Sequence, residues 1–159
     1  MKSMEIVYIA LGANLGDREK NMRNAHGHIM RLEGIQPGKI SKFYETAPFG
    51  GPAQPMFLNA ALEIKTSMSP HQLLEELQRI ELHMGRIRKE KWGPRTIDLD
   101  IVFFGDRIVE DAQLKIPHPL MHERMFVLEP LAEIAPNAAH PVLKKTVFQM
   151  YQELKTFHQ

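Results

Sequence analysis

Hydrophobic and polar positions along the chain follow two periods, which together predict a mixture of strands and helices. The unbroken apolar run at 6–11 indicates a strand that is buried on both faces or lies in the middle of a sheet. Apolar residues at every second position from 58 to 64 indicate a strand with one buried face. Alternation also predicts strands over 40–45 and 96–104.

Two segments carry the three- and four-residue spacing of apolar side chains that is typical of an amphipathic helix. The first spans 18–33 and follows Asp17, which is placed to cap it. The second begins with a capping box formed by Ser69 and Gln72, and Gly85 ends it. Its apolar stripe consists of Leu73, Leu74, Leu77, Ile80 and Met84.

The segments between these elements predict how the elements connect. Gly and Pro at 34–38 predict a turn, and the three prolines and two glycines of 46–56 predict an irregular loop. Short helices are expected within 120–134 and 142–154. The order β-α-β-β-α-β plus a C-terminal extension predicts a ferredoxin-like α+β fold in a single domain, 1–159. Its antiparallel sheet would carry both helices on one face.

Composition narrows the possible kinds of site and the cellular location. The 159 residues include no cysteine, which excludes structural disulfides, zinc–thiolate sites, iron–sulfur clusters and cysteine nucleophiles. The longest unbroken apolar run is far too short to span a membrane. We therefore expect a cytoplasmic protein that has no membrane partner.

The net charge of +1 conceals an uneven distribution of charge along the chain. Five basic residues and one acid between 86 and 95 give this window a charge of +4, so the remainder sums to −3. Such clustering creates a local positive field. The field suits a small, highly charged ligand better than a long polyanion, and we expect no nucleic-acid partner. The alternative is an ordinary solvated charge run.

Two aspartates follow this window on the strand predicted over 96–104. Residues two apart on a strand point to the same side, so Asp98 and Asp100 share one face. The other face carries Ile97, Leu99, Ile101 and Phe103, which are expected to pack against the helices. Adjacent like charges destabilise a sheet unless a cation offsets them. The carboxylates suit Mg²⁺ bound together with a polyphosphate; the alternative is an exposed strand whose acids only increase solubility.

Several motifs, spread over nearly the whole chain, occur in the order found in a known enzyme family. The most specific is Trp92-Gly-Pro-Arg-Thr-Ile-Asp-Leu-Asp-Ile, together with the preceding Arg86-x-Arg-Lys. Further segments begin at Tyr8, Tyr44, Gln54, Arg79 and Ile116. Together they resemble the 6-hydroxymethyl-7,8-dihydropterin pyrophosphokinases of folate biosynthesis, whose ferredoxin-like fold agrees with the predicted order of elements.

The resemblance implies an ATP-dependent enzyme that transfers pyrophosphate to the hydroxymethyl group of 6-hydroxymethyl-7,8-dihydropterin and releases AMP. Asp98 and Asp100 match the ligands of two Mg²⁺ ions, and Arg86 and Arg95 match the catalytic arginines. The implied ATP-binding residues are Gln78, Arg88, Lys89, Ile101, His118 and Arg124. Lys89 and Trp92 fall in the family's lid loop, whose closure excludes water.

The resemblance also implies a pterin site, and we expect the enzyme to be a monomer. The implied pterin-binding residues are Thr46, Phe49, Phe57, Asn59, Trp92, Asp98 and Phe126. An Asn side chain offers a donor and an acceptor to the amide-like edge of a pterin, and aromatic faces can stack on its bicyclic ring. Phe57 stands where some relatives carry tyrosine. Gly12 and Asn14 either contribute to the site or serve only the strand-to-helix turn, because their loop lacks a P-loop motif.

Two other classes of function fit parts of the same pattern. A two-metal nucleotidyltransferase would use a similar acidic pair but release pyrophosphate rather than AMP. An RNA-recognition module shares the predicted topology but presents aromatic residues on its exposed central strands. Here Asp98 and Asp100 occupy such a strand and would repel a phosphate backbone in the absence of metal.

Overall fold

An antiparallel sheet with the strand order β2-β4-β1-β5 forms the centre of the molecule, and the short strand β3 also pairs with β4. The computed structural model describes residues 3–47, 56–85 and 96–157. The elements, in chain order, are β1 (Glu5–Ala13), α1 (Arg18–Met30), β2 (Ile35–Ile40), β3 (Tyr44–Thr46), β4 (Phe57–Thr66), α2 (Pro70–His83), β5 (Asp98–Phe104), β6 (Val109–Glu110), β7 (Lys115–Ile116), the 3₁₀ helix η1 (Met121–Glu123), α3 (Met125–Ile134) and α4 (Val147–Phe157).

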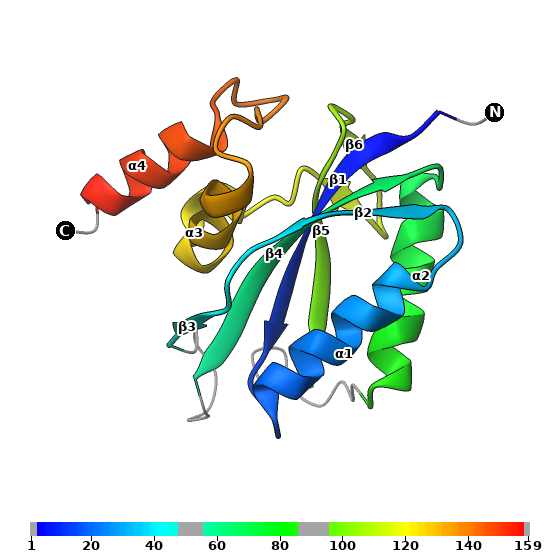
Figure 1. The fold of residues 1–159 in the computed structure, drawn as a ribbon. Helices are drawn as coiled ribbons and strands as arrows, with labels where there is room; N and C mark the ends of the chain where they lie inside the picture. Colours follow the sequence, from blue (N-terminus) through cyan, green and yellow to red (C-terminus); the bar gives the residue numbers. More distant parts are fainter. Residues whose placement is uncertain (1–2, 48–55, 86–95, 158–159) are drawn as a thin grey trace.

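The connectivity confirms the predicted ferredoxin-like fold. The first and last strands of the β-α-β-β-α-β order, β1 and β5, are neighbours, and β1 also pairs with β4. Figure 1 shows α1 and α2 on one side of the sheet and α3 and α4 on the other. The two first helices therefore share a face, as predicted, and the C-terminal extension covers part of the opposite face. Within the described residues, no helix is both long and apolar enough to cross a membrane.

The alternation of side chains on the central strands separates two hydrophobic clusters. The cluster beneath α1 and α2 contains Val7, Ile9 and Leu11 of β1. The cluster beneath α3 and α4 contains Ala61 of β4, with Tyr8 packed against it. Because strand residues point to alternate faces, each strand supplies both clusters. The face that meets α3 and α4 also carries the acidic pair.

Local capping signals agree with the predicted helix starts. The side chain of Asp17 accepts a hydrogen bond from the backbone of Lys20, as expected for a cap of α1. Ser69 and Gln72 form the reciprocal capping box at the start of α2. These interactions involve residues within one turn of each other, so the sequence contains the information needed to place them.

The second predicted strand was wrong in its position. The sequence predicts a turn over 34–38 and a strand over 40–45, whereas β2 occupies Ile35–Ile40. β2 lies at the edge of the sheet, where Pro37 is tolerated because a ladder hydrogen bond is not needed on the outer side. A Cβ on Gly38 would lie 2.5 Å from the carbonyl oxygen of Glu63, so the close approach of β4 requires glycine there.

The predicted orientation of Phe103 was also wrong. The pairing of β1 with β5 shifts register between Tyr8 and Ile9, which leaves Val102 as an additional residue on β5. This β-bulge turns Phe103 toward the cluster beneath α3 and α4, where its ring packs edge-on against Tyr8 at a centroid distance of 6.4 Å. Phe104 then occupies the cluster beneath α1 and α2.

Candidate active site

One row of residues across the sheet brings together groups from three strands. Gly12 of β1 is paired with Asn59 of β4 on one side and with Asp98 of β5 on the other. In the next row on the same face, Ala10 lies opposite Asp100. On β1, the small residue Gly12 lies between Asn59 and Asp98, and the small residue Ala10 lies between Ala61 and Asp100.

Asn59 is the buried anchor of this row. Its side chain is 6% exposed, and its Nδ2 atom donates a hydrogen bond of 2.6 Å to Oγ1 of Thr46. A Cβ placed on Gly12 would lie 3.1 Å from Oδ1 of Asn59 and 3.9 Å from the ring of Phe57. The structure therefore brings three predicted pterin-binding residues, Thr46, Phe57 and Asn59, to one place opposite Asp98.

A hydrogen bond near the surface joins the neighbouring strand β3 to α3 beside this part of the site. Tyr44 of β3 is paired with Asn59, and its hydroxyl donates to Oε1 of Glu133 at 2.6 Å. Burial and this carboxylate raise the pKa of Tyr44 above its ordinary value. The backbone N–H of Lys42 donates to both carboxylate oxygens of Glu133 at 3.2 Å. Glu133 thus fixes β3, the strand that supplies Thr46.

Asp98 and Asp100 lie two residues apart on β5 and share one face of the sheet, as their spacing predicts. Asp98 is half-buried and Asp100 is exposed, whereas Leu99 between them is buried beneath the helices. Among the described residues, no group of three or more His, Asp or Glu side chains could hold a metal ion alone. Two carboxylates beside the small residues Ala10 and Gly12 nevertheless fit Mg²⁺, because this ion keeps several waters and takes other ligands from phosphates.

His118 lies beside β5 and is held by backbone contacts. Its N–H donates to the carbonyl oxygen of Val102 at 3.0 Å, and its ring atom Nδ1 accepts from the N–H of Leu120 at 3.3 Å. Burial, together with a smaller contribution from the positive charge of Arg124, lowers the pKa of His118 to about 4. A neutral ring whose Nδ1 accepts carries its proton on Nε2, so His118 is a hydrogen-bond donor at neutral pH.

Arg124 and Phe126 complete this side of the site. The guanidinium of Arg124 lies over the ring of Phe126, 5.5 Å from its centroid, and Phe126 packs partly buried against the cluster beneath α3 and α4. The positive charge of Arg124 also contributes to the lowered pKa of His118. Two predicted ATP-binding residues and one predicted pterin-binding residue are therefore close neighbours at the start of α3.

The low pKa of His118 predicts a dependence of stability on pH. The folded-state pKa of about 4 lies below the ordinary histidine value of 6.5, so the unfolded chain binds this proton first as pH falls. The stabilisation is complete above pH 6.5 and is lost toward pH 4, by about 3 kcal/mol. Chemical unfolding of the wild type and of His118→Gln between about pH 7 and about pH 4 checks this. Equal pH slopes for the two proteins would contradict it.

Other predicted site residues have different environments or lie outside the described residues. Gln78 is exposed on α2. Ile101 is 4% exposed beneath α1 and α2, so a contact with ATP would involve its main-chain atoms. The predicted residues in the ranges 48–55 and 86–95, which the structure does not describe, are Phe49, Arg86, Arg88, Lys89, Trp92 and Arg95.

Two residues have a larger part in the described geometry than the sequence indicated. Gly12 forms the floor between Asn59 and Asp98, whereas its sequence context equally suggested a simple turn. Glu81 is buried on α2, and its carboxylate accepts a hydrogen bond from Leu99. The sequence does contain a signal for Glu81, since it falls one helical turn after Leu77 within the apolar stripe.

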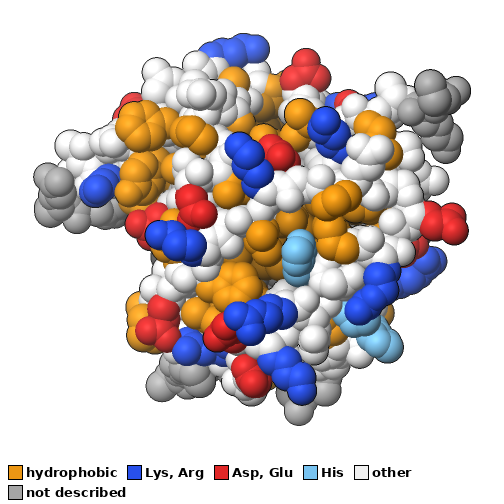
Figure 2. Space-filling view, in the orientation of Figure 1, with side chains coloured by type: hydrophobic (Ala, Val, Ile, Leu, Met, Phe, Trp, Pro, Cys, Tyr) orange, Lys and Arg blue, Asp and Glu red, His pale blue; other side chains and the backbone are white. Residues whose placement is uncertain are grey.

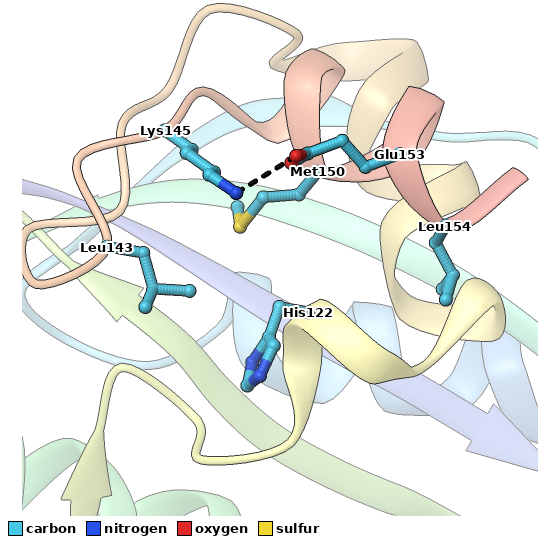
Figure 3. Close-up of a pocket in the computed structure, with 6 residues that line it drawn as sticks. All are labelled: His122, Leu143, Lys145, Met150, Glu153 and Leu154. Atoms are coloured by element: carbon cyan, nitrogen blue, oxygen red, sulfur yellow. Dashed lines mark hydrogen bonds and ion pairs between the residues drawn. The ribbon is translucent and has the colours of Figure 1, made fainter. Parts of the chain in front are cut away.

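A separate cavity of about 260 Å³ lies beside α4 (Figure 3). It is lined by His122, Leu143, Lys145, Met150, Glu153 and Leu154. An ion pair of 2.9 Å joins Lys145 to Glu153 across it. The buried Nδ1 atom of His122 has no hydrogen-bond partner among the described residues. None of the predicted site residues lines this cavity, so it is distinct from the row at Gly12.

Comparison with known proteins supplies independent information about the family. The family model described as 7,8-dihydro-6-hydroxymethylpterin-pyrophosphokinase (HPPK) matches residues 8–136. A relative from Bacillus subtilis (strain 168), named 2-amino-4-hydroxy-6-hydroxymethyldihydropteridine pyrophosphokinase, is 52% identical over 129 residues, which cover 81% of this chain and 77% of the relative. A relative of the same name from Aquifex aeolicus (strain VF5) is 40% identical over 157 residues, which cover 97% and 96%.

Solved structures agree with the fold. The HPPK-DHPS of Plasmodium falciparum, crystallised with pteroate, superposes with a TM-score of 0.75 at 18% identity over 96% of this chain. An HPPK-DHPS in complex with substrates gives a TM-score of 0.76 at 14% identity over 98% of this chain. The chain spans only 43% and 44% of these two solved chains. At such identities the likeness establishes the fold alone.

Proposed function

Because the chain belongs to the 7,8-dihydro-6-hydroxymethylpterin-pyrophosphokinase family, we propose that it transfers pyrophosphate from ATP to 6-hydroxymethyl-7,8-dihydropterin and releases AMP. Members of this family are ATP-dependent transferases of folate biosynthesis. One observation about the site supports the proposal most strongly. The row Asn59–Gly12–Asp98 places a buried amide beside an acidic pair on the same face of the sheet.

The pterin would occupy the space above Gly12. Asn59 is held by Thr46 through its Nδ2 atom, and its Oδ1 atom faces Gly12, where it can accept from the donor edge of a pterin. Phe57 lies at the same position and Phe126 lies at the start of α3, so both offer aromatic surfaces for a bicyclic ring. The ring would therefore be oriented with its hydroxymethyl group toward the acidic pair.

Asp98 and Asp100 would hold Mg²⁺, two ions in the full proposal. When bound with ATP, Mg²⁺ neutralises phosphate charge and orients the triphosphate. The fit rests on two hard carboxylate donors that share a face and on the small residues Ala10 and Gly12 beside them. Among the described residues, the support for a magnesium site therefore comes from the residue types on β5 and β1 and from the pairing of these two strands.

The transfer itself requires one bond to form and one to break. The hydroxymethyl oxygen forms a bond to the β-phosphorus of ATP and loses its proton to solvent water. The bond from that phosphorus to the oxygen that bridges to the α-phosphorus breaks, and AMP leaves with the electron pair. His118 would donate its Nε2 proton in a hydrogen bond to a phosphate oxygen, and Arg124 would add positive charge beside it.

The remaining parts of the proposal come from the family resemblance. Arg86 and Arg95 would bind phosphate oxygens and stabilise the charge that develops during transfer. Lys89 and Trp92 would belong to a lid that excludes water and so limits hydrolysis of ATP. All four residues lie in the range 86–95, outside the described residues.

Three broader expectations belong to the same proposal. We expect the chain to act as a single domain and as a monomer. We also expect a cytoplasmic location, because ATP is abundant there. Neither ATP nor the pterin requires a membrane or a nucleic-acid partner.

Product analysis tests the proposed reaction directly. Incubation of the purified chain with Mg²⁺, ATP and 6-hydroxymethyl-7,8-dihydropterin should yield AMP and the pterin diphosphate in equal amounts. Release of pyrophosphate instead would identify a nucleotidyltransferase. Turnover of ATP without AMP would contradict the proposal.

RNA binding is the alternative that does not involve catalysis. Figure 2 shows acidic and basic side chains interspersed on the face that it draws, rather than a continuous basic surface among the residues described there. A long polyanion would therefore meet repulsion as well as attraction on that face. Tight, salt-sensitive binding of RNA in EDTA would favour this alternative over the transferase.

A further inference from the structure

A buried carboxylate from α2 contacts the backbone of the acidic strand. Glu81 is 6% exposed, and its Oε2 atom accepts a hydrogen bond of 2.8 Å from the N–H of Leu99. Leu99 lies between Asp98 and Asp100 on β5. Glu81 therefore acts on the peptide unit that separates the two proposed magnesium ligands.

Simple helix packing does not account for an acid at this position. Glu81 directly follows the buried Ile80 and lies one turn after the buried Leu77, where an apolar side chain would complete the stripe of α2. Taking a carboxylate out of water costs several kcal/mol unless hydrogen bonds and charges compensate for it. A residue such as Met or Leu would fill the same space without this cost.

The hydrogen bond holds the peptide unit that joins Asp98 to Leu99, at an edge of the sheet. β5 is the last strand in the order β2-β4-β1-β5, so within the described residues its outer edge has no neighbouring strand. Because a peptide unit is planar, fixing the N–H of Leu99 also fixes the carbonyl of Asp98. The dihedral angles on either side of this unit set the directions of the Asp98 and Asp100 side chains.

We propose that Glu81 is a positioning residue for the pyrophosphoryl transfer, holding the backbone between Asp98 and Asp100 in the conformation that receives Mg²⁺ and ATP. A bond to an ionised acceptor is stronger than one to a neutral acceptor, which explains why a carboxylate occupies the position. Gln78, a predicted ATP-binding residue, lies three residues earlier on the same side of α2. This inference rests on the proposed function, since it assigns Glu81 a role in that reaction.

Three variants distinguish a role of Glu81 in positioning the acidic strand from a role in packing α2 alone. Glu81→Met fills the stripe but cannot accept the hydrogen bond, and Glu81→Gln keeps a neutral acceptor of nearly the same shape. Glu76→Ala is the matched control, because Glu76 lies on the same helix and pairs with Arg79 at 2.6 Å near the surface. For each variant we would measure AMP formation, the Mg²⁺ concentration that gives half-maximal rate, the dissociation constant of the pterin and the unfolding temperature.

The substitutions are expected to change the dependence of the rate on Mg²⁺ but not the affinity for the pterin. Glu81→Met should lower kcat and raise the half-maximal Mg²⁺ concentration by about 10- to 100-fold, as is typical when a group that orients a metal ligand is removed. The pterin dissociation constant should stay within about twofold, and Glu81→Gln should restore most of the rate, leaving a deficit of about two- to tenfold. Glu76→Ala should match the wild type.

A direct measurement of the Leu99 amide provides the structural readout. In the wild type this amide should exchange slowly with solvent, and Glu81→Met should accelerate its exchange by at least about tenfold while core amides of β1 remain protected. A folded Glu81→Met variant with wild-type Mg²⁺ dependence would overturn the inference. If Glu81→Met does not fold, Glu81→Gln decides: a wild-type rate of AMP formation in that variant, without the expected deficit of about two- to tenfold, would overturn the inference.

The inference and the proposed function fail in different ways. If the wild type forms no AMP, the proposed function is wrong and the role of Glu81 in it falls as well. If the wild type forms AMP while the Glu81 variants retain the wild-type response to Mg²⁺, only the inference about Glu81 is wrong.

Discussion

Replacing Asp98 or Asp100 with Asn will lower the rate of AMP formation by about 100- to 1,000-fold, the loss typical when a group that stabilises transition-state charge is removed. The carboxylates share one face of β5, and Asp98 faces the floor at Gly12. Asn keeps the shape of each side chain but removes the charge that attracts Mg²⁺. Steady-state assays of AMP at several Mg²⁺ concentrations will measure the effect.

The fold should survive these substitutions. Reducing the charge on one face of a strand relieves repulsion between like charges, so the unfolding temperature should change by only a few degrees. Asp106→Asn is the matched control, because Asp106 is exposed in the turn just after β5. A variant at Asp98 or Asp100 with near-wild-type activity would exclude the proposed metal role. So would an equal loss of activity in the control.

Replacing Gly12 with Val will weaken pterin binding by about 10- to 100-fold, because overfilling a packed site commonly costs 1–3 kcal/mol. A Cβ on Gly12 would already lie 3.1 Å from Oδ1 of Asn59. Asn59 is buried and held by Thr46, so it cannot move away easily. The added methyl groups would occupy the space assigned to the pterin ring, and titration with the fluorescent pterin will measure the loss.

A second glycine provides the control for this substitution. Gly27 lies within α1, and a Cβ there would lie 3.5 Å from the flexible guanidinium of Arg31. Gly27→Val should leave pterin affinity unchanged, because Val is no worse than Gly within a helix. Unaltered pterin affinity in Gly12→Val would place the pterin elsewhere.

Much of the fold was predictable because its signals are local. The capping box at Ser69 and the cap at Asp17 depend on residues close together in sequence. The same holds for the shared face of Asp98 and Asp100, which follows from the two-residue period of a strand. These features, combined with the family motifs, were sufficient to predict the ferredoxin-like order and the acidic pair. The single buried face predicted for 58–64 was wrong, because Asn59 and Ala61 on the second face of β4 are buried as well.

The errors arose where distant contacts override local preference. Pro37 and Gly38 are typical of a turn, yet they belong to β2 because the edge of the sheet tolerates proline and the backbone of β4 approaches the glycine closely. Phe103 follows the alternation of its strand only until the bulge at Val102, which arises from the pairing of β5 with β1. No local pattern indicates that change of register.

The amino-acid sequence is enough to identify the acidic pair on one strand face, the basic window at 86–95 and Asn59 as a candidate for pterin binding. The folded chain alone reveals that Asn59 and Asp98 lie on either side of Gly12, and that Glu81 contacts the peptide between the aspartates. The physical reason is that strand and helix periods fix the direction of a side chain along its own element. The register between elements depends on packing over the whole core.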